Sequence, residues 1–196
     1  MNKQEIKDFF NRLAPSWDAG MIKDDRIIEK ILTNAGVAED KDILDVACGT
    51  GVLFPYYFAK KVRSLTAVDI SPEMVRIAVK KFKDNTSCPI RIICDDIMEM
   101  NFDRKFDCIM IYNAFPHFDD PKGLINILSR QLKPGGTLTV AHGMSRSKID
   151  SHHHGAASSV SIGLMSEDEL ASLMEPKLSV ICKISDDEMY QVSAIL

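Results

Sequence analysis

The residues with the clearest chemical meaning are the nine from Ile43 to Gly51, which read Ile-Leu-Asp-Val-Ala-Cys-Gly-Thr-Gly. The apolar run at their start is typical of a short strand buried in a parallel sheet, and the glycines then turn the chain into an apolar helix. Two glycines leave room for a ligand to approach the backbone, and the N–H groups of the following helix point at it. A dinucleotide loop would carry a third glycine three residues later, but position 54 is Phe. We therefore expect this loop to bind a nucleoside rather than a pyrophosphate.

The elements that must position this loop alternate between strand and helix along most of the chain. Two leading helices are expected over 2–13 and 22–35, and Ser166-x-x-Glu169 is a capping box that starts the last helix. Another helix should run from Asp120-Pro121 to the turn at 133–136. The predicted strands are 42–46, 64–69, 90–93, 106–111, 137–141, 178–184 and 189–195. Such alternation predicts an α/β fold, with a parallel sheet covered by helices on both faces.

Composition argues against several classes of protein. A chain of 196 residues suits a single domain over 1–196. The 24 Lys and Arg residues against 28 Asp and Glu residues give a formal net charge of −4, without blocks of like charge, which argues against a nucleic-acid partner. No apolar run approaches the ~20 residues of a membrane span, and no signal peptide is recognisable. The five scattered cysteines are typical of reduced packing residues, so we expect a cytoplasmic protein. Because no apolar run is long enough to span a membrane, we expect no membrane partner.

One segment departs from the alternation. Residues 143–165 are rich in Ser, Gly, Ala and His and show little apolar periodicity. A loop of this length inside a compact domain is usually either a functional lid or disordered. We therefore expect 143–165 to act as a lid or acceptor loop, and 1–36 to form an N-terminal helical cap.

Motifs at successive strand ends give the chain a family resemblance over nearly its whole length. The motifs are 43–51, 67–71, 94–97, 106–117 and 132–138. In this order they resemble the motifs of the class I S-adenosylmethionine-dependent methyltransferases. The opening segment 10–18 is similar to that of small-molecule members such as the quinone methyltransferases, which typically carry Tyr where Trp17 stands. The resemblance implies a Rossmann-like, doubly wound, seven-stranded, mostly parallel sheet whose last strand is antiparallel. It also implies S-adenosylmethionine as cofactor and a small-molecule methyl acceptor.

The resemblance further implies a set of cofactor-binding residues. Asp69, which lies 18 residues beyond Gly51 at a strand end, would accept hydrogen bonds from both ribose hydroxyls. Asp96 would accept a bond from the adenine amino group, with Asp95 as its rival. Trp17 would either close the pocket beside the sulfonium or staple the first helix, and Asp45 would either reach the ligand or tie down the loop. The set is Trp17, Asp45, Ala47, Gly49, Gly51, Asp69, Ile70, Asp96, Ile97 and Tyr112.

All five histidines lie in the half of the chain expected to bind the acceptor. His117 follows the fourth strand and His142 ends the fifth, and we predict both as catalytic, because a protonated acceptor needs a base. The alternative for each is a packing or capping role. With the run His152-His153-His154 nearby, a second hypothesis is a divalent metal held by His117, His142 and His153. The alternative for that run is a mobile, solvated lid.

The sequence favours in-line methyl transfer from S-adenosylmethionine to a small molecule. The fourth strand ends in Tyr112-Asn113-Ala114-Phe115, not in the Asn/Asp-Pro-Pro-aromatic motif of methylases that act on planar amino groups, which leaves O-, S- and C-methylation open. A metal-assisted methyltransferase and a non-catalytic S-adenosylmethionine-binding module remain alternatives. A nicotinamide-dependent oxidoreductase is disfavoured by Phe54.

Overall fold

A seven-stranded sheet in the order β3-β2-β1-β4-β5-β7-β6 forms the centre of the molecule in a computed structural model. The structure describes residues 2–153 and 160–196, without the side chains of 150–153. The strands are β1 (Asp42–Val46), β2 (Ser64–Asp69), β3 (Ile90–Cys94), β4 (Phe106–Tyr112), β5 (Leu132–His142), β6 (Ser179–Ser185) and β7 (Tyr190–Ile195). Neighbours from β3 to β5 are parallel, whereas β7 is antiparallel to both β5 and β6. The predicted mostly parallel sheet with an antiparallel last strand is confirmed.

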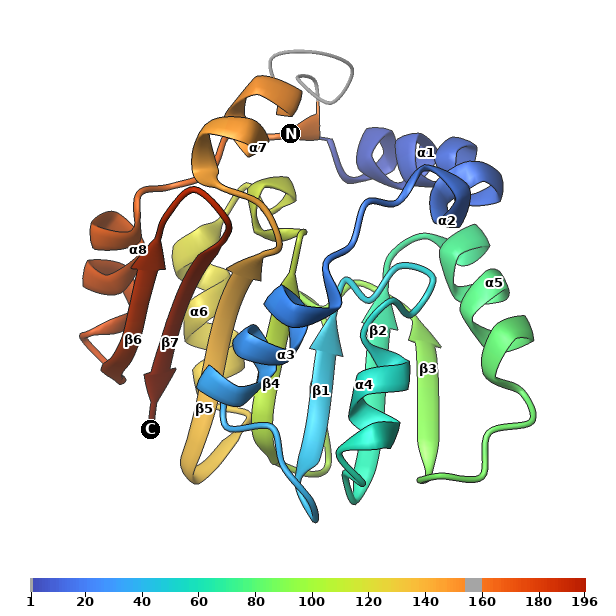
Figure 1. Ribbon diagram of the computed structural model, residues 1–196, viewed down its shortest axis with the longest axis horizontal. Helices are drawn as coiled ribbons and strands as arrows, with labels where there is room; N and C mark the ends of the chain where they lie inside the picture. Colours follow the sequence, from blue (N-terminus) through green and yellow to red (C-terminus); the bar gives the residue numbers. More distant parts are fainter. Residues whose placement is uncertain (1, 154–159) are drawn as a thin grey trace.

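Helices cover both faces of this sheet and also its upper edge. Figure 1 shows α3 and α4 in front of the sheet, α6 and α8 behind it, and α1, α2 and α7 above the carboxyl ends of the parallel strands. The helices are α1 (Lys3–Leu13), α2 (Trp17–Gly20), α3 (Asp25–Asn34), α4 (Phe54–Ala59), α5 (Pro72–Phe82), α6 (Pro121–Ser129), α7 (Arg146–His153) and α8 (Glu167–Met174). Two short 3-10 turns, η1 (Ala14–Ser16) and η2 (Phe115–His117), adjoin the same upper edge.

Each face of the sheet has its own apolar core. Successive side chains of a strand point to opposite faces, so Ile43 packs with α3 and α4 while Leu44 packs with α6 and α8. All five residues of β1 are buried. This double burial explains why the first strand is a nearly continuous apolar run instead of an alternating one.

Local capping defines where two of the helices begin. The Ser71 hydroxyl accepts a hydrogen bond from the Met74 N–H at 3.2 Å, and Pro72 occupies the first helical position of α5. At α8, the Ser166 hydroxyl accepts from the Glu169 N–H, and the Glu169 carboxylate accepts from the Ser166 N–H at 2.8 Å. The predicted capping box is therefore confirmed.

Two predicted helix boundaries were wrong, and the fifth strand begins at Leu132 rather than at position 137. Helix α6 ends at Ser129 rather than at the turn over 133–136, because that stretch already belongs to the sheet. The Gly135 N–H donates to the Leu196 carbonyl, and the Leu196 N–H donates to the Gly136 carbonyl. The second helix, α3, begins at Asp25 rather than at position 22, because the Asp24 carboxylate caps its first turn.

No helix was expected within 143–165, and this was wrong for the first part of the segment, whereas its role as a lid or acceptor loop stays a prediction. Residues Arg146–His153 form helix α7, whose first turn closes with the Ile149 N–H donating to the Ser145 carbonyl at 3.1 Å. Ile149 is buried in the core against the sheet. A single buried apolar residue leaves no periodic pattern in the sequence, so hydrophobic periodicity could not predict this helix. Residues 154–159, with His154, lie outside the described residues.

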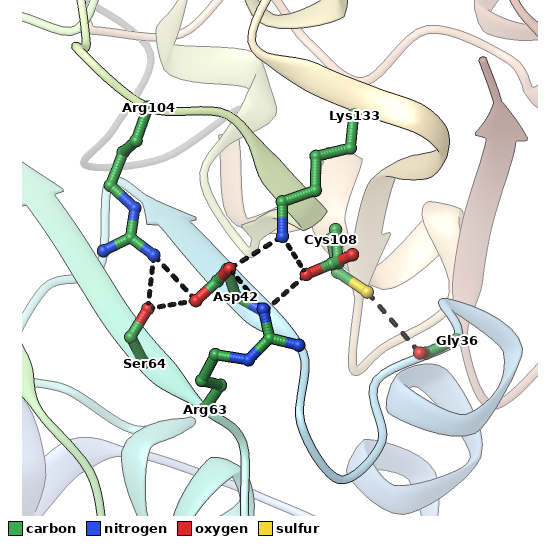
Figure 2. Close-up of polar contacts among 8 residues, drawn as sticks. Gly36, Asp42, Arg63, Ser64, Arg104, Cys108 and Lys133 are labelled. Carbon is green, nitrogen blue, oxygen red and sulfur yellow. Dashed lines mark hydrogen bonds and ion pairs between the residues drawn. The ribbon is translucent and has the colours of Figure 1, made fainter.

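A polar cluster occupies the opposite, amino-terminal edge of the sheet (Figure 2). At its centre is the buried Asp42 carboxylate, which accepts hydrogen bonds from Arg63, Arg104 and Lys133 at 3.1, 2.7 and 2.7 Å. Burial acts to raise the pKa of Asp42, but the bonds from Lys133 and its neighbours outweigh it and hold the pKa at about 2. This cluster ties β1, β2 and β5 together far from the glycine loop.

Within the part of the chain that the structure describes, no helix is long and apolar enough to cross a membrane.

Candidate functional site

A cavity of about 590 Å³ lies where the carboxyl ends of the parallel strands meet. The register places Val46, Val68 and Ile111 side by side on β1, β2 and β4, so the loops that follow these strands open to one edge. Eight of the ten predicted cofactor residues line this cavity, together with both predicted catalytic histidines. These are Trp17, Ala47, Gly49, Asp69, Ile70, Asp96, Ile97, Tyr112, His117 and His142.

The two glycines of the loop have different surroundings. Both adopt left-handed backbone conformations, with φ of 55° at Gly49 and 84° at Gly51. A Cβ on Gly49 would point toward Trp17, whose Nε1 would be 3.9 Å away. A Cβ on Gly51 would collide with the rings of Phe54 and Phe82 at 2.7 and 2.8 Å. Gly49 therefore faces the cavity, whereas Gly51 allows the turn to pack on the following helix.

Asp69 is held in place by the backbone of two neighbouring loops. One carboxylate oxygen accepts a hydrogen bond from the Gly49 N–H and the other from the Ser71 N–H, each at 2.8 Å. Burial raises the pKa of Asp69, and these two N–H groups oppose that rise. Each oxygen has a second lone pair. The carboxylate is thus oriented at the cavity and keeps acceptor capacity for two hydroxyl groups of a ligand.

The neighbouring acids differ in what they contact. Asp96 accepts a hydrogen bond from the Met98 N–H at 2.9 Å, and its second oxygen forms a 2.5 Å ion pair with Lys3 of α1. Asp95 accepts from the Asp96 N–H at 2.8 Å and also lines the cavity. The ion pair closes the N-terminal segment over the predicted adenine end of the cavity.

The N-terminal segment is also anchored beside the glycine loop. The Thr50 hydroxyl donates to Asp18 at 2.5 Å, and the Lys81 ammonium donates to the same carboxylate at 2.8 Å. The Trp17 ring packs edge-on against Phe10, with centroids 5.8 Å apart. Trp17 therefore both borders the cavity and packs on α1. Its two predicted roles, closing the pocket and holding the first helix, are both compatible with this position.

Asp45 lies behind the glycine loop. It is only 2% exposed and is absent from the described residues that line the cavity. Burial raises its pKa to about 8, with Asp69 adding to the rise and the neighbouring Tyr57 hydroxyl opposing it. This placement favours the loop-supporting alternative over direct contact with a ligand.

The acceptor end of the cavity carries the two predicted catalytic histidines. Nδ1 of His117 lies 2.7 Å from the Val160 carbonyl oxygen, and its ring packs edge-on against Phe10 with centroids 4.9 Å apart. A carbonyl oxygen only accepts, so Nδ1 bears the proton and Nε2 is the basic nitrogen of the neutral ring. His142 is 3% exposed and packs against Tyr190. The structure thus brings both histidines to one cavity.

The predicted metal site is not matched by a cluster of ligands among the described residues. Among the residues that the structure describes, no group of three or more His, Cys, Asp or Glu side chains is arranged to hold a metal ion. His153 ends helix α7, but its side chain lies outside the described residues. The ligand set His117, His142 and His153 therefore stays a prediction.

Sequence reasoning missed several residues of the cavity. Lys3 and Cys48 both line it, but no sequence signal could pair Lys3 with Asp96, because they lie 93 positions apart in the chain. A signal did exist for α1, whose Ile6, Phe9 and Phe10 share one apolar face that lines the cavity.

Comparisons with known proteins agree with this geometry. A family model described as a methyltransferase domain matches residues 43–136. The chain is 33% identical over 143 residues to a malonyl-[acyl-carrier protein] O-methyltransferase of Priestia megaterium, with 70% of this chain and 51% of that protein covered. It is 29% identical to a demethylmenaquinone methyltransferase of Tropheryma whipplei, with 69% and 58% covered. The chain spans about half the length of these curated relatives.

A solved structure extends the likeness to the whole fold. A SAM-dependent methyltransferase from Aquifex aeolicus has a TM-score of 0.70 at 21% identity, with 100% of this chain and 98% of that chain covered. The sheet order, the glycine loop and these likenesses define an S-adenosylmethionine-binding fold. The matched methyltransferase domain, these relatives and the fold together support a class I S-adenosylmethionine-dependent methyltransferase, as the sequence motifs predicted.

Proposed function

We propose that this chain transfers a methyl group from S-adenosylmethionine to a small-molecule acceptor. The observation that carries the proposal is one continuous cavity of about 590 Å³, which is large enough for a nucleoside and a small second ligand. It joins Gly49, Asp69 and Asp96 at one end to His117 and His142 at the other. Donor and acceptor can therefore lie side by side in it.

The donor would be held by groups of three kinds. The doubly anchored Asp69 carboxylate would accept from the ribose hydroxyls. Asp96 would accept from the adenine amino group, with Ile70 and Ile97 against the ring. For this contact, adenine must share or replace the Lys3 ion pair. Trp17 would lie near the sulfonium, where an indole face attracts a cation.

When bound, S-adenosylmethionine supplies an electrophilic methyl group and leaves as a neutral thioether. The chain contributes alignment in a cavity covered by α1, and such positioning can supply roughly 7–11 kcal/mol. Nε2 of His117, made basic by the Val160 contact at Nδ1, would take the proton of a protic acceptor. His142 would border the acceptor from the end of β5.

The acceptor class and the location are part of the same proposal. Apart from Lys3, which pairs with Asp96, no Lys or Arg side chain is among the described residues of the cavity. An acceptor without a carboxylate therefore fits it better than an anionic one. The five free cysteines support a reducing compartment such as the cytoplasm.

Calorimetric titration with S-adenosylhomocysteine tests the donor site. We expect binding by the wild type, and a loss of affinity of about 10-fold to 100-fold in Asp69→Ala, because two ribose hydroxyls lose the carboxyl group that would accept their hydrogen bonds. Asp103→Ala is the matched control, since Asp103 is exposed near the opposite edge of the sheet. Failure of the wild type to bind would overturn the proposal. Binding without product formation from any acceptor of a broad panel would favour the non-catalytic module.

A further inference from the structure

The carboxyl ends of β4 and β5 are joined by a side-chain contact that the proposed reaction does not use. Oδ1 of Asn113, the residue after β4, accepts a hydrogen bond from the Gly143 N–H, just after β5, at 3.0 Å. The Asn113 N–H also donates to the Ala141 carbonyl at 2.9 Å. Asn113 therefore binds the end of β5 through both its backbone and its side chain. We call Tyr112, Asn113 and Gly143 the β4–β5 clasp.

The backbone conformation of Asn113 does not by itself require asparagine. Its φ is 55°, in the left-handed region that glycine adopts without steric cost and that asparagine tolerates better than most residues. Glycine would meet the backbone requirement at least as well. What asparagine adds over glycine at this position is the hydrogen bond that its side chain accepts from the Gly143 N–H.

That bond determines what surrounds the Tyr112 hydroxyl. A Cβ built on Gly143 would lie 2.3 Å from the hydroxyl oxygen, so the phenol tip is packed directly on the Gly143 backbone. A shift of Gly143 would therefore shift the hydroxyl. Burial raises the pKa of Tyr112 to about 12, and the Asn113 side chain opposes that rise, which places the amide close to the phenol. The hydroxyl stays neutral and can both donate and accept.

Tyr112 and Asn113 both line the cavity at the carboxyl end of β4, whereas Gly143 is absent from its described lining. We propose that Asn113 is a positioning residue that, by holding Gly143, keeps the Tyr112 hydroxyl at the cavity wall for contact with the bound nucleoside. The inference rests on the proposed function, because it presumes that the cavity binds the donor. Asn113 acts through Tyr112 and not on the reacting atoms.

A double-mutant cycle with S-adenosylhomocysteine as the probe tests this inference. Asn113→Gly removes the side chain and keeps the left-handed backbone, and Tyr112→Phe removes only the hydroxyl. We expect each single variant to bind about three- to tenfold more weakly, as for one lost hydrogen bond. In the double variant we expect an affinity within about twofold of the weaker single variant, because both changes remove the same contact.

The controls separate positioning from general damage to the fold. Asp40→Gly is matched to Asn113→Gly, since Asp40 has a φ of 61° and is absent from the described lining of the cavity. It should bind like the wild type. Asn113→Gly should melt within about 2–4 °C of the wild type. The inference is overturned if either single variant binds with wild-type affinity. It is also overturned if the fold-loss of affinity in the double variant equals the product of the two single fold-losses. If the wild type itself does not bind, the proposed function fails first and this inference falls with it.

Discussion

Asp45 shows how a single buried group can dominate the pH response of this protein. It is 2% exposed, and its folded-state pKa of about 8 lies far above the usual value near 3.8. Between these two values the folded state holds a proton that the unfolded state releases. The free energy of unfolding must therefore fall as pH rises through this window.

Asp45→Asn should remove this dependence. The stability of the wild type relative to the variant should fall by up to about 1.4 kcal/mol per pH unit between about pH 4 and pH 8, the slope for one proton. Urea unfolding of both proteins at several pH values measures it. Exposed Asp103→Asn should instead track the wild type. Parallel stability curves for wild type and Asp45→Asn would contradict the buried, protonated state of Asp45.

At the scale of elements, the N-terminal segment is the part most dependent on the contents of the cavity. No residue of α1 is fully buried, and its apolar face lines the cavity. The N-terminal segment is attached to the sheet edge by polar contacts, such as Lys3 of α1 to Asp96 and Asp18 of α2 to Thr50. A few polar contacts of this kind contribute little stability compared with a buried apolar face. A bound ligand would supply the apolar contacts that α1 lacks.

Trp17 offers a direct measurement of this coupling, because it is the only tryptophan in the chain. Titration with S-adenosylhomocysteine should change its fluorescence and saturate at the concentration found by calorimetry. Trp17→Phe should abolish the signal and weaken binding by about three- to tenfold, through lost aromatic and packing contacts. Unchanged fluorescence at saturating ligand would show that Trp17 does not border the ligand.

For the whole molecule, the cluster around Asp42 holds the sheet together at the edge remote from the cavity. Asp42 is buried, and its folded pKa of about 2 lies below the usual 3.8. A lowered pKa contributes stability above the unfolded pKa, and this stability is lost as pH falls through the folded pKa. The relevant window therefore runs from about pH 4 down to about pH 2.

Asp42→Asn should lower the free energy of unfolding by about 2 kcal/mol at pH 7, the value that corresponds to this pKa change. The difference from the wild type should shrink as pH falls below about 4. Urea unfolding at pH 7, 4 and 3 measures it, with exposed Asp84→Asn as control. S-adenosylhomocysteine affinity should stay unchanged, since Asp42 is absent from the described lining of the cavity. A constant difference at all three pH values would contradict this account.

Much of this architecture is local in origin and could be predicted. Strand β1 is a continuous apolar run because it is buried on both faces, and Ser71-Pro72 and Ser166 to Glu169 cap their helices through bonds a few residues long. Parallel strands bring their carboxyl ends to one edge, so Asp69, His117 and His142 could be assigned to a common site. These features depend on short-range periodicity and on general rules of topology.

Tertiary structure alone decided the contacts between distant segments. The pairing of Lys3 with Asp96, the different roles of Gly49 and Gly51, and the placement of Asp45 behind the loop depend on how separate elements pack. Helix α7 was missed because one buried residue, Ile149, anchors it and leaves no period. The amino-acid sequence determined the strands, most of the helices and the family resemblance, because those follow from local patterns. The geometry of the cavity wall, including the bond from Gly143 to Asn113, follows only from three-dimensional packing.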